Sequence, residues 1–270
     1  MKNELRITIV QTTLHWKSYD ANIKMLDEKL ASISAETTDI IVLPEMFTSG
    51  FTMDAEKCFE TMNGKVVDWM KLKSKALQCA ICGSLIIYEN EKYYNRLIWM
   101  EPSGLSYTYD KAHLFRLSDE HKTYTKGTQK LIINYKGWNI CPMICYDIRF
   151  PIWCRQQFSN SETYRGQFDI LLFVANWPER RNIAWKNLLQ SRAIENQCYV
   201  VGANRVGFDG NEIYHSGDSS IINPLGEIME QVSNDDIIIQ QKIVLDELIK
   251  IRRTYQFWQD ADEFEIVKIK

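Results

Sequence analysis

The chain has 270 residues, of which 45% are hydrophobic and 25% are charged, and its formal net charge is −3. This composition excludes a disordered or fibrous chain, and the length is sufficient to bury a large core. The charge balance provides no basic surface for nucleic acid or anionic lipid, and no apolar run approaches the roughly 18 residues of a membrane span. We therefore expect neither a nucleic-acid nor a membrane partner.

The N-terminus and the cysteines bear on the cellular compartment. Met1 to Arg6 carries charges and leads directly into a strand-like stretch, without the apolar region or cleavage site of a signal peptide. Seven cysteines, an odd number, are spread through a chain with ample apolar residues for a core. This pattern favours reduced thiols over a disulfide framework, so we expect a cytoplasmic protein.

Strand and helix patterns alternate in the first part of the chain. β-Branched runs at 6–10 and 39–43 predict two buried strands, and Pro44 ends the second. Two amphipathic helices are predicted from apolar residues at helical spacing, which are Ile23, Leu26, Leu30 and Ile33 after a cap at Asp20, and then Val66, Trp69, Met70 and Leu77. Strand-like runs at 80–88, 93–100 and 105–109, separated by polar turns, predict an antiparallel meander.

The second part continues the alternation. Strands are predicted at 138–145, 169–175 and 198–203, helices at 147–157 and 181–195, and three or four short strands after them. No linker, repeat or low-complexity stretch divides the chain, so residues 1–270 are predicted to form one domain. The pattern indicates an α/β fold in which sheets pack on each other and helices cover them outside.

Polar residues at three predicted strand ends are candidates for catalysis. Glu45, in Leu-Pro-Glu-Met-Phe, follows a buried strand, and apolar neighbours would raise its pKa and suit it to act as a base. The alternative is a carboxylate that only hydrogen bonds a loop backbone. Lys111 ends the meander among aromatic and apolar residues, where it could stabilise an oxyanion; the alternative is a surface lysine that buries only its stem.

Cys145 lies at a predicted strand-to-helix junction, in Ile-Cys-Tyr-Asp-Ile-Arg-Phe-Pro. The positive end of a helix would stabilise its thiolate, and the N–H of Tyr146 could serve as an oxyanion donor. The alternative is a buried structural cysteine. A nucleophile, a base and a cation are a complete set for acyl transfer, but the spacing alone does not show that they converge.

Other catalytic motifs are absent from the sequence. There is no nucleophile elbow G-x-S-x-G, phosphate-binding loop, dinucleotide fingerprint or H-E-x-x-H zinc motif. A mechanism with a histidine base would depend on one of four residues, of which only His113 and His121 are near the candidate residues in sequence.

The three motifs, in this order, resemble those of the nitrilase superfamily of carbon–nitrogen hydrolases. The resemblance extends to Asn-Trp-Pro at 176–178, Ser-Arg-Ala-Ile-Glu-Asn at 191–196, Gly-Ala-Asn-Arg-Val-Gly at 202–207 and His-Ser-Gly-Asp-Ser-Ser at 215–220, and so covers nearly the whole chain. Within the superfamily the chain is most similar to bacterial omega-amidases, which cleave the amide of 2-oxoglutaramate and 2-oxosuccinamate. The resemblance implies a four-layer α-β-β-α sandwich of two mixed sheets, and a homodimer or higher even homo-oligomer.

The resemblance also implies roles for individual residues. Glu45 would be the base, Cys145 the nucleophile, and Lys111 with the Tyr146 N–H the oxyanion donors, with a thioester intermediate. Glu120 resembles the second glutamate of the family, which positions the substrate and the lysine. Two carboxylates around one ammonium would raise one glutamate pKa and keep the lysine charged. Neither a metal nor an organic cofactor is implied.

An omega-amidase substrate carries a carboxylate far from its amide, which an arginine could bind. Arg149, four residues after the nucleophile, is the first candidate and Arg116 the second; Arg149 could equally pair with Asp147 as part of the scaffold. Phe115, Tyr146 and Trp177 could line the pocket, or they could be ordinary aromatic core.

Three other interpretations compete with this one. Cys79, Cys82, Cys141 and Cys145 could bind zinc or form a redox pair, although the apolar run around Cys79 and Cys82 favours core packing. The same fold and triad could serve a carbamoylase, another amidase or an acyltransferase, and the scaffold could be a non-catalytic binding protein. The segment 245–270 could pack at a subunit interface or close the pocket.

Overall fold

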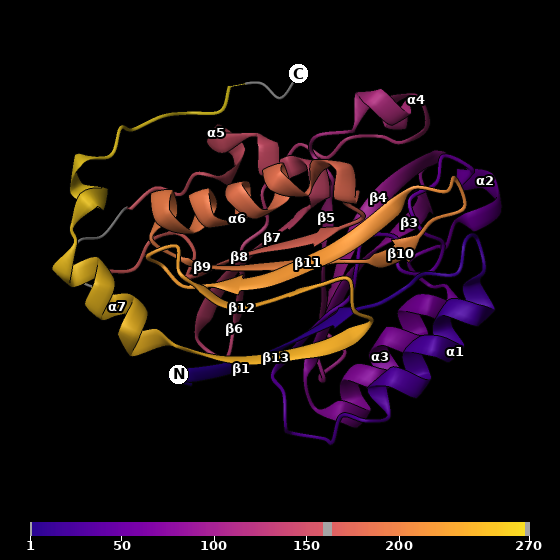
Figure 1. Ribbon diagram of the computed structural model, residues 1–270, viewed down its shortest axis with the longest axis horizontal. Coiled ribbons are helices and arrows are strands. Elements are labelled where there is room, and N and C mark those ends of the chain that lie inside the picture. Colours follow the sequence, from indigo (N-terminus) through magenta and orange to yellow (C-terminus); the bar gives the residue numbers. More distant parts are fainter. Residues whose placement is uncertain (1, 159–163, 268–270) are drawn as a thin grey trace.

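In the computed structural model, which describes residues 2–158 and 164–267, two mixed sheets pack face to face (Figure 1). The first sheet has the strand order β13-β1-β2-β3-β4-β5. Its strands are β1 (Glu4–Gln11), β2 (Ile40–Val42), β3 (Ala80–Glu89), β4 (Lys92–Met100), β5 (Ser106–Asp110) and β13 (Ile237–Val244). Strands β1, β2 and β3 run parallel, and β3, β4 and β5 form the antiparallel meander that the sequence predicts.

The second sheet has the order β10-β11-β9-β8-β7-β6, and β12 pairs with β11. Its strands are β6 (Ile133–Tyr135), β7 (Trp138–Ile144), β8 (Ile170–Ala175), β9 (Tyr199–Asn204), β10 (Val206–Phe208), β11 (Tyr214–Ile222) and β12 (Ile228–Ser233). The central strands β7, β8 and β9 are parallel, so their carboxyl ends meet at one edge.

Helices cover the outer faces of both sheets. Helices α1 and α3 lie on one side of the pair of sheets and α6 on the other, which gives the expected α-β-β-α layers (Figure 1). The helices are α1 (Tyr19–Leu30), α2 (Ala55–Cys58), α3 (Lys65–Leu77), α4 (Glu120–Thr123), α5 (Pro151–Cys154), α6 (Asn182–Asn196) and α7 (Leu245–Thr254). Short 3₁₀ turns span Arg116–Ser118, Cys145–Arg149, Glu179–Arg181 and Phe257–Asp260.

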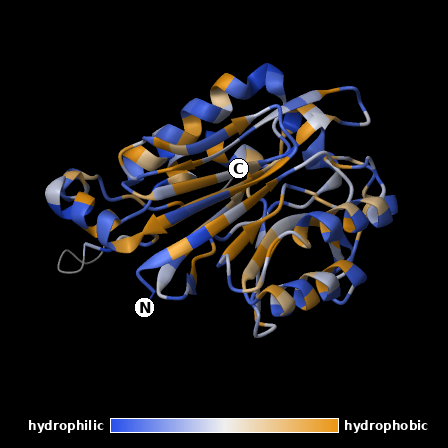
Figure 2. Ribbon diagram, turned by 60° about the horizontal axis from the view of Figure 1, so that its bottom comes forward, coloured by the Kyte–Doolittle hydropathy of each residue, from blue (hydrophilic) through white to orange (hydrophobic). Residues whose placement is uncertain are grey.

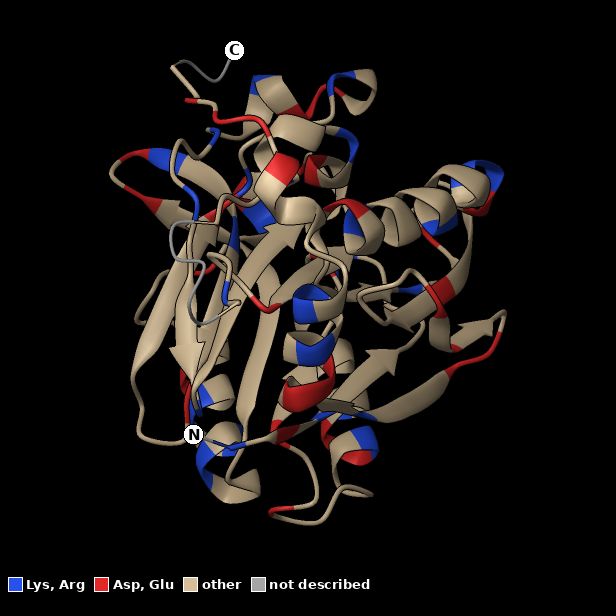
Figure 3. Cartoon of the chain, turned by 90° about the vertical axis from the view of Figure 1, so that its left-hand side faces the viewer, with Lys and Arg blue, Asp and Glu red and all other residues tan. Residues whose placement is uncertain are grey.

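The period-two alternation of the strands builds two apolar layers. In β1, Ile7 and Ile9 belong to the core between the sheets, whereas Val10 belongs to the core beneath α1 and α3. Burial of each such side chain contributes about 1.5–3 kcal/mol to folding. Apolar residues accordingly follow the strands and the inner helix faces in Figure 2, and charged residues gather on helices, loops and edges in Figure 3.

Two predictions of local structure are wrong. Asp20, the expected cap of the first helix, lies in the first turn of α1, whose N-cap is Ser18. The helix expected over 147–157 is replaced by the 3₁₀ turn Cys145–Arg149 and the four-residue α5. The cause is Pro151, because the ring of a proline holds the preceding residue in an extended conformation. Phe150 has φ −109° and ψ 93°, which ends the turn and lets α5 begin with proline at its first position.

The C-terminal segment packs against its own chain over the described residues. In α7, the buried Arg252 side chain donates hydrogen bonds to the carbonyl oxygens of Gln197 (2.8 Å) and Phe168 (2.9 Å). Residues 268–270 lie outside the described part. No helix in the described ranges has the length and apolar character required to cross a membrane.

The cysteines of the alternative zinc or redox interpretation do not converge. Cys79 belongs to the core beneath the helices, and Cys82 faces the opposite layer between the sheets. Burial raises the pKa of Cys79 and of Cys141 to about 12, which opposes the thiolate form that binds metal. Over the described residues, no group of three or more histidine, cysteine or acidic side chains is arranged to hold a metal ion.

Candidate active site

The candidate residues from the strand ends meet at one place. Glu45 follows β2, Lys111 follows β5, Cys145 follows β7 and Asn176 follows β8. The first and last of these segments touch directly, because the Glu45 N–H donates to the Ala175 carbonyl at 3.4 Å. Parallel strands deliver their carboxyl ends to a common edge, and two packed sheets bring two such edges together.

Lys111 lies between two glutamates. Its Nζ is 2.8 Å from Oε1 of Glu45 and 3.0 Å from each carboxylate oxygen of Glu120, and only 1% of the residue is exposed. Burial alone would lower the pKa of this lysine, but the charges of Glu120 and Glu45 outweigh burial and raise it. The side chain is therefore a permanent cation rather than a surface lysine.

The two carboxylates are held by further donors. Nδ2 of Asn95, in the middle of β4, lies 2.8 Å from Oε1 of Glu45 and 3.2 Å from Oε1 of Glu120. The Phe115 N–H donates to Glu120 at 2.5 Å, and the Asn176 N–H donates to Oε2 of Glu45 at 2.8 Å. Burial, followed by the charge of Glu45, raises the pKa of Glu120 although Lys111 opposes it. A raised glutamate pKa is the direction expected when two carboxylates share one ammonium.

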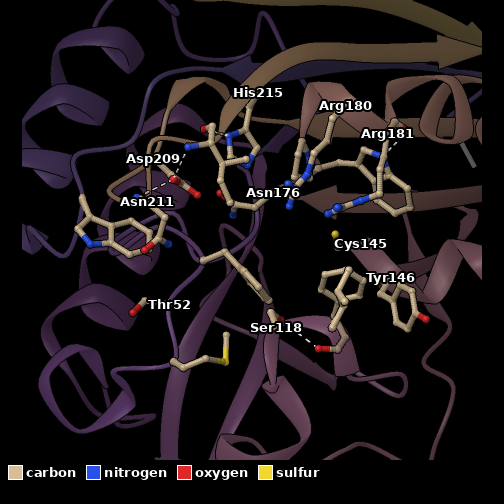
Figure 4. Close-up of a pocket in the computed structure, with 18 of the residues that line it drawn as sticks. Thr52, Ser118, Cys145, Tyr146, Asn176, Arg180, Arg181, Asp209, Asn211 and His215 are labelled. Atoms are coloured by element: carbon tan, nitrogen blue, oxygen red, sulfur yellow. Dashed lines mark hydrogen bonds between the residues drawn. The ribbon is translucent and has the colours of Figure 1, made fainter.

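The Cys145 backbone has φ 44°, in the left-handed region that residues other than glycine seldom adopt. This turn directs the thiol into the cavity (Figure 4). Burial, with the charge of Glu45, raises the pKa of Cys145 well above its ordinary value, against the opposing effect of Lys111. The expectation that a helix end stabilises the thiolate is therefore wrong, since a five-residue 3₁₀ turn supplies little dipole and burial dominates.

A cavity of about 450 Å³ opens onto the thiol. Besides Lys111 and Cys145, it is lined by Phe115, Tyr146, Arg149 and Trp177 from the sequence-based candidates. The Arg149 guanidinium lies 4.8 Å from the centre of the Trp177 ring, and no described acid, Asp147 included, forms an ion pair with it. Arg116 is not brought to this cavity: it begins the 3₁₀ turn 116–118 and lines a neighbouring cavity, although Leu117 and Ser118 of the same turn line this one.

Sequence reasoning missed several lining residues. Arg180 and Arg181 lie near Cys145 in Figure 4, and the Arg181 guanidinium is 5.1 Å from the centre of the Phe115 ring. Both follow Asn-Trp-Pro after a single residue, Glu179, so their position shortly beyond a strand end was the available signal. His215 also lines the cavity, and burial, together with the charge of Arg205, lowers its pKa to about 4.

This geometry agrees with the comparisons to known proteins. Residues 6–253 match the family model described as carbon-nitrogen hydrolase. The chain belongs to this family, within the nitrilase superfamily, as the sequence motifs predict, and it is an amidohydrolase.

Curated proteins and a solved structure are similar to this chain over nearly its whole length. The chain is 41% identical to the omega-amidase YafV of Escherichia coli K12, over 97% of this chain and 98% of that one. It is 30% identical to the 2-oxoglutaramate amidase of Bacillus subtilis 168, over 94% and 96%. The crystal structure of XC1258 from Xanthomonas campestris, a CN-hydrolase superfamily protein with an arsenic adduct in the active site, has a TM-score of 0.95 at 39% identity, over 98% of this chain and 100% of that one.

Proposed function

We propose that this protein hydrolyses the terminal amide of small 2-oxo dicarboxylate monoamides, 2-oxoglutaramate and 2-oxosuccinamate, through a thioester on Cys145. The observation that carries the proposal is a thiol beside a buried glutamate–lysine–glutamate cluster, in a cavity that arginines also line. The names of the E. coli and B. subtilis relatives support the substrate class.

Acylation begins with proton transfer from Cys145 to Glu45. A base is required, because the raised pKa of Cys145 keeps the thiol protonated near neutral pH. The sulfur attacks the amide carbon, and the electron pair of the C=O bond moves to oxygen. The Lys111 ammonium and the Tyr146 N–H stabilise this oxyanion. The C–N bond then breaks, protonated Glu45 gives its proton to nitrogen, and ammonia leaves the acyl thioester.

Deacylation uses the same base. Glu45 takes a proton from water as the oxygen attacks the thioester carbon, and Lys111 and the Tyr146 N–H again stabilise the oxyanion. The C–S bond breaks, the carboxylic acid leaves, and the sulfur recovers its proton from Glu45. Glu120 keeps Lys111 at the oxyanion position, which its 3.0 Å contacts from both carboxylate oxygens support.

The cationic part of the cavity suits the distal carboxylate of the substrate. Arg149, Arg180 and Arg181 line the cavity, and none of them forms an ion pair with an acid in the described ranges. A guanidinium binds a carboxylate through two parallel hydrogen bonds. Aromatic rings support two of these arginines, since Arg149 lies over Trp177 and Arg181 over Phe115.

Ammonia release from 2-oxoglutaramate tests the proposal. Wild-type protein should release ammonia, and the Cys145→Ala variant should lose the activity. Cys141→Ala is the matched control, because it removes another buried thiol, from the strand that leads to Cys145, and should retain turnover. Turnover of a different small amide in place of 2-oxoglutaramate, still lost in Cys145→Ala, would replace the substrate and keep the mechanism. Full activity in Cys145→Ala would reject both the proposed substrate assignment and the thioester mechanism.

The arginines are tested separately. Arg149→Ala, Arg180→Ala and Arg181→Ala should each be assayed on 2-oxoglutaramate and on a neutral amide of similar length. Loss of a charged hydrogen bond predicts a fall of about 10- to 100-fold in kcat/KM on the 2-oxo acid amide for the arginine that binds the carboxylate. The neutral amide should be affected much less. Equal losses on both substrates for all three variants would contradict carboxylate recognition.

A further inference from the structure

Asp147 is a fully buried carboxylate that the mechanism above does not use. Its Oδ1 accepts hydrogen bonds from the backbone N–H of His113 at 2.9 Å and from Nδ1 of the same residue at 2.8 Å. Its Oδ2 accepts from the Tyr109 hydroxyl at 2.7 Å and from the Ile144 N–H at 3.1 Å. All four donors point at one side chain, and no lysine or arginine of the described residues forms an ion pair with it.

The four donors come from the two segments that carry the reacting groups. Tyr109 is the penultimate residue of β5 in the first sheet, two residues before Lys111, and His113 follows Lys111 by two residues. Ile144 ends β7 in the second sheet, immediately before Cys145. A single carboxylate therefore joins the strand end that carries the ammonium to the strand end that carries the thiol.

The backbone at the thiol requires such support. A residue with a Cβ in the left-handed region costs about 1–2 kcal/mol, and such a conformation persists only where its surroundings enforce it. The hydrogen bond from the Ile144 N–H to Asp147 spans Cys145 and closes the turn in which φ is 44°. On the other side, Trp153 donates from Nε1 to the Tyr109 hydroxyl at 2.9 Å, so that hydroxyl is fixed as well.

We propose that Asp147 is a positioning residue that holds the Cys145 thiol and the Lys111 ammonium at the separation the reaction needs. The inference rests on the proposed roles of these two groups. It assigns Asp147 no contact with substrate. The carboxylate is suited to this task because it accepts hydrogen bonds only, and each of its oxygens receives two donors.

The Asp147→Asn variant tests the proposal. Asparagine keeps the shape, but its amide group places a donor against two of the four donors, so the two segments must move apart. Because a misplacement of about 1 Å costs on the order of 100-fold in rate, we expect kcat to fall by about 10- to 100-fold with a small change in KM. The milder Tyr109→Phe variant removes one donor and should lower kcat by a few-fold.

Alkylation of Cys145 by iodoacetamide, followed by mass spectrometry of its peptide, separates positioning from general destabilisation. The rate should fall in Asp147→Asn at a folded fraction equal to wild type. Asp169→Asn is the matched control: Asp169 is a fully buried carboxylate at the amino end of β8, where it accepts from the Asn139 N–H at 2.9 Å, and its loss should leave the alkylation rate unchanged.

The outcomes are distinguishable. Wild-type kcat and wild-type alkylation in folded Asp147→Asn, or in Tyr109→Phe should the first variant not fold, would overturn the positioning role. Equal losses in Asp169→Asn would also overturn it, because the effect would then be one of stability. If Cys145→Ala retained amidase activity, the proposed function would fail, but alkylation would still decide whether Asp147 controls the thiol.

Discussion

The two ends of β2 each carry a buried carboxylate, and their surroundings are opposite. Asp39, just before the strand, meets Lys2 at 2.6 Å, Arg6 at 3.1 Å and Lys136 at 2.7 Å, so three cations surround one acid. Glu45, just beyond the other end, shares one cation with a second acid, because Lys111 lies between Glu45 and Glu120.

The difference in charge balance shifts the pKa values of the carboxyl groups at the two ends of β2 in opposite directions. Burial would raise the pKa of Asp39, but hydrogen bonds from Arg6, Lys136 and Lys2 outweigh burial and hold it well below its usual range. At the other end, burial and the charge of Glu45 raise the pKa of Glu120. An excess of cations fixes a permanent charge that stabilises the fold, whereas a second carboxylate beside the same ammonium raises a glutamate pKa, as it does at Glu120.

The sharpest test of this contrast is Glu45→Gln. The amide cannot act as a base, so turnover of the amide substrate should fall by about 10²- to 10⁴-fold. Glutamine can still accept from Asn95 and Lys111 through its one oxygen, but its amide nitrogen then faces the Asn176 N–H, which donates to Oε2 of Glu45. We therefore expect the free energy of unfolding to fall by about 1–3 kcal/mol. Ammonia release and urea unfolding measure the two quantities. A large loss of stability with retained turnover would show that Glu45 stabilises the fold and is not the catalytic base.

Asp39→Asn should lose stability without losing turnover. The variant loses charge-assisted hydrogen bonds to Lys2, Arg6 and Lys136, whose side chains are partly exposed and therefore partly screened. We expect the free energy of unfolding to fall by about 1–3 kcal/mol while kcat of the folded enzyme stays unchanged. Thermal melts and turnover at a temperature well below the transition provide the readout. A loss of kcat without a loss of stability would contradict the view that Asp39 stabilises the fold and takes no part in catalysis.

The two ends should also give opposite pH slopes of stability. Asp39 has a lower pKa in the folded than in the unfolded chain, so its contribution is complete above about pH 4 and is lost as the pH falls below that value. Glu120 has a folded pKa raised above 4.5, so the folded chain retains a proton that the unfolded chain releases, and stability falls as the pH rises through this window.

Urea unfolding between pH 2.5 and 7, in roughly half-unit steps, can resolve slopes of up to about 1.4 kcal/mol per pH unit for each proton. Asp39→Asn should flatten the acidic limb and leave the limb above pH 4.5 in place. Glu120→Gln should flatten the limb above pH 4.5 and leave the acidic limb in place. If each variant kept both wild-type slopes, the pKa shifts at the two ends of β2 would not control stability.

Local sequence patterns predicted the site where its residues follow strands. Glu45, Lys111 and Cys145 could be picked out as candidates because apolar runs reveal where a strand ends, and the polar residue just beyond is exceptional. Their convergence was implied only by the resemblance to the nitrilase superfamily. Asn95 lies in the middle of β4, where the alternation of side chains along the strand predicts only which face of the sheet it lies on. Its contacts to Glu45 and Glu120 depend on strands distant in sequence, which periodicity does not specify.

The fold was predicted on the same basis and was wrong where two local signals disagreed. Apolar spacing after Cys145 favours a continuous helix, whereas Pro151 forces the preceding residue to be extended. In the structure Phe150 is extended and the continuous helix does not form. Asp147 could not be assigned a role for a related reason. Its nearest charged neighbour in sequence is Arg149, but burial pairs it with Tyr109 and His113, which lie about a strand and a loop away.

The weakest effect is predicted for Asp119 and Lys122, a third acid–base pair, which borders Glu120 in sequence. Their charged atoms are 3.0 Å apart, as close as Lys111 is to Glu120, but the side chains of Lys122 and Asp119 are 67% and 60% exposed. Water screens such a pair and competes for its hydrogen bonds, so the distance alone carries little energy. Asp119→Asn and Lys122→Met should each leave the melting temperature and turnover at wild-type values. A clear loss of turnover in either variant would mean that exposed charges act on the cluster through solvent, and burial would then no longer explain the difference between the two ends of β2.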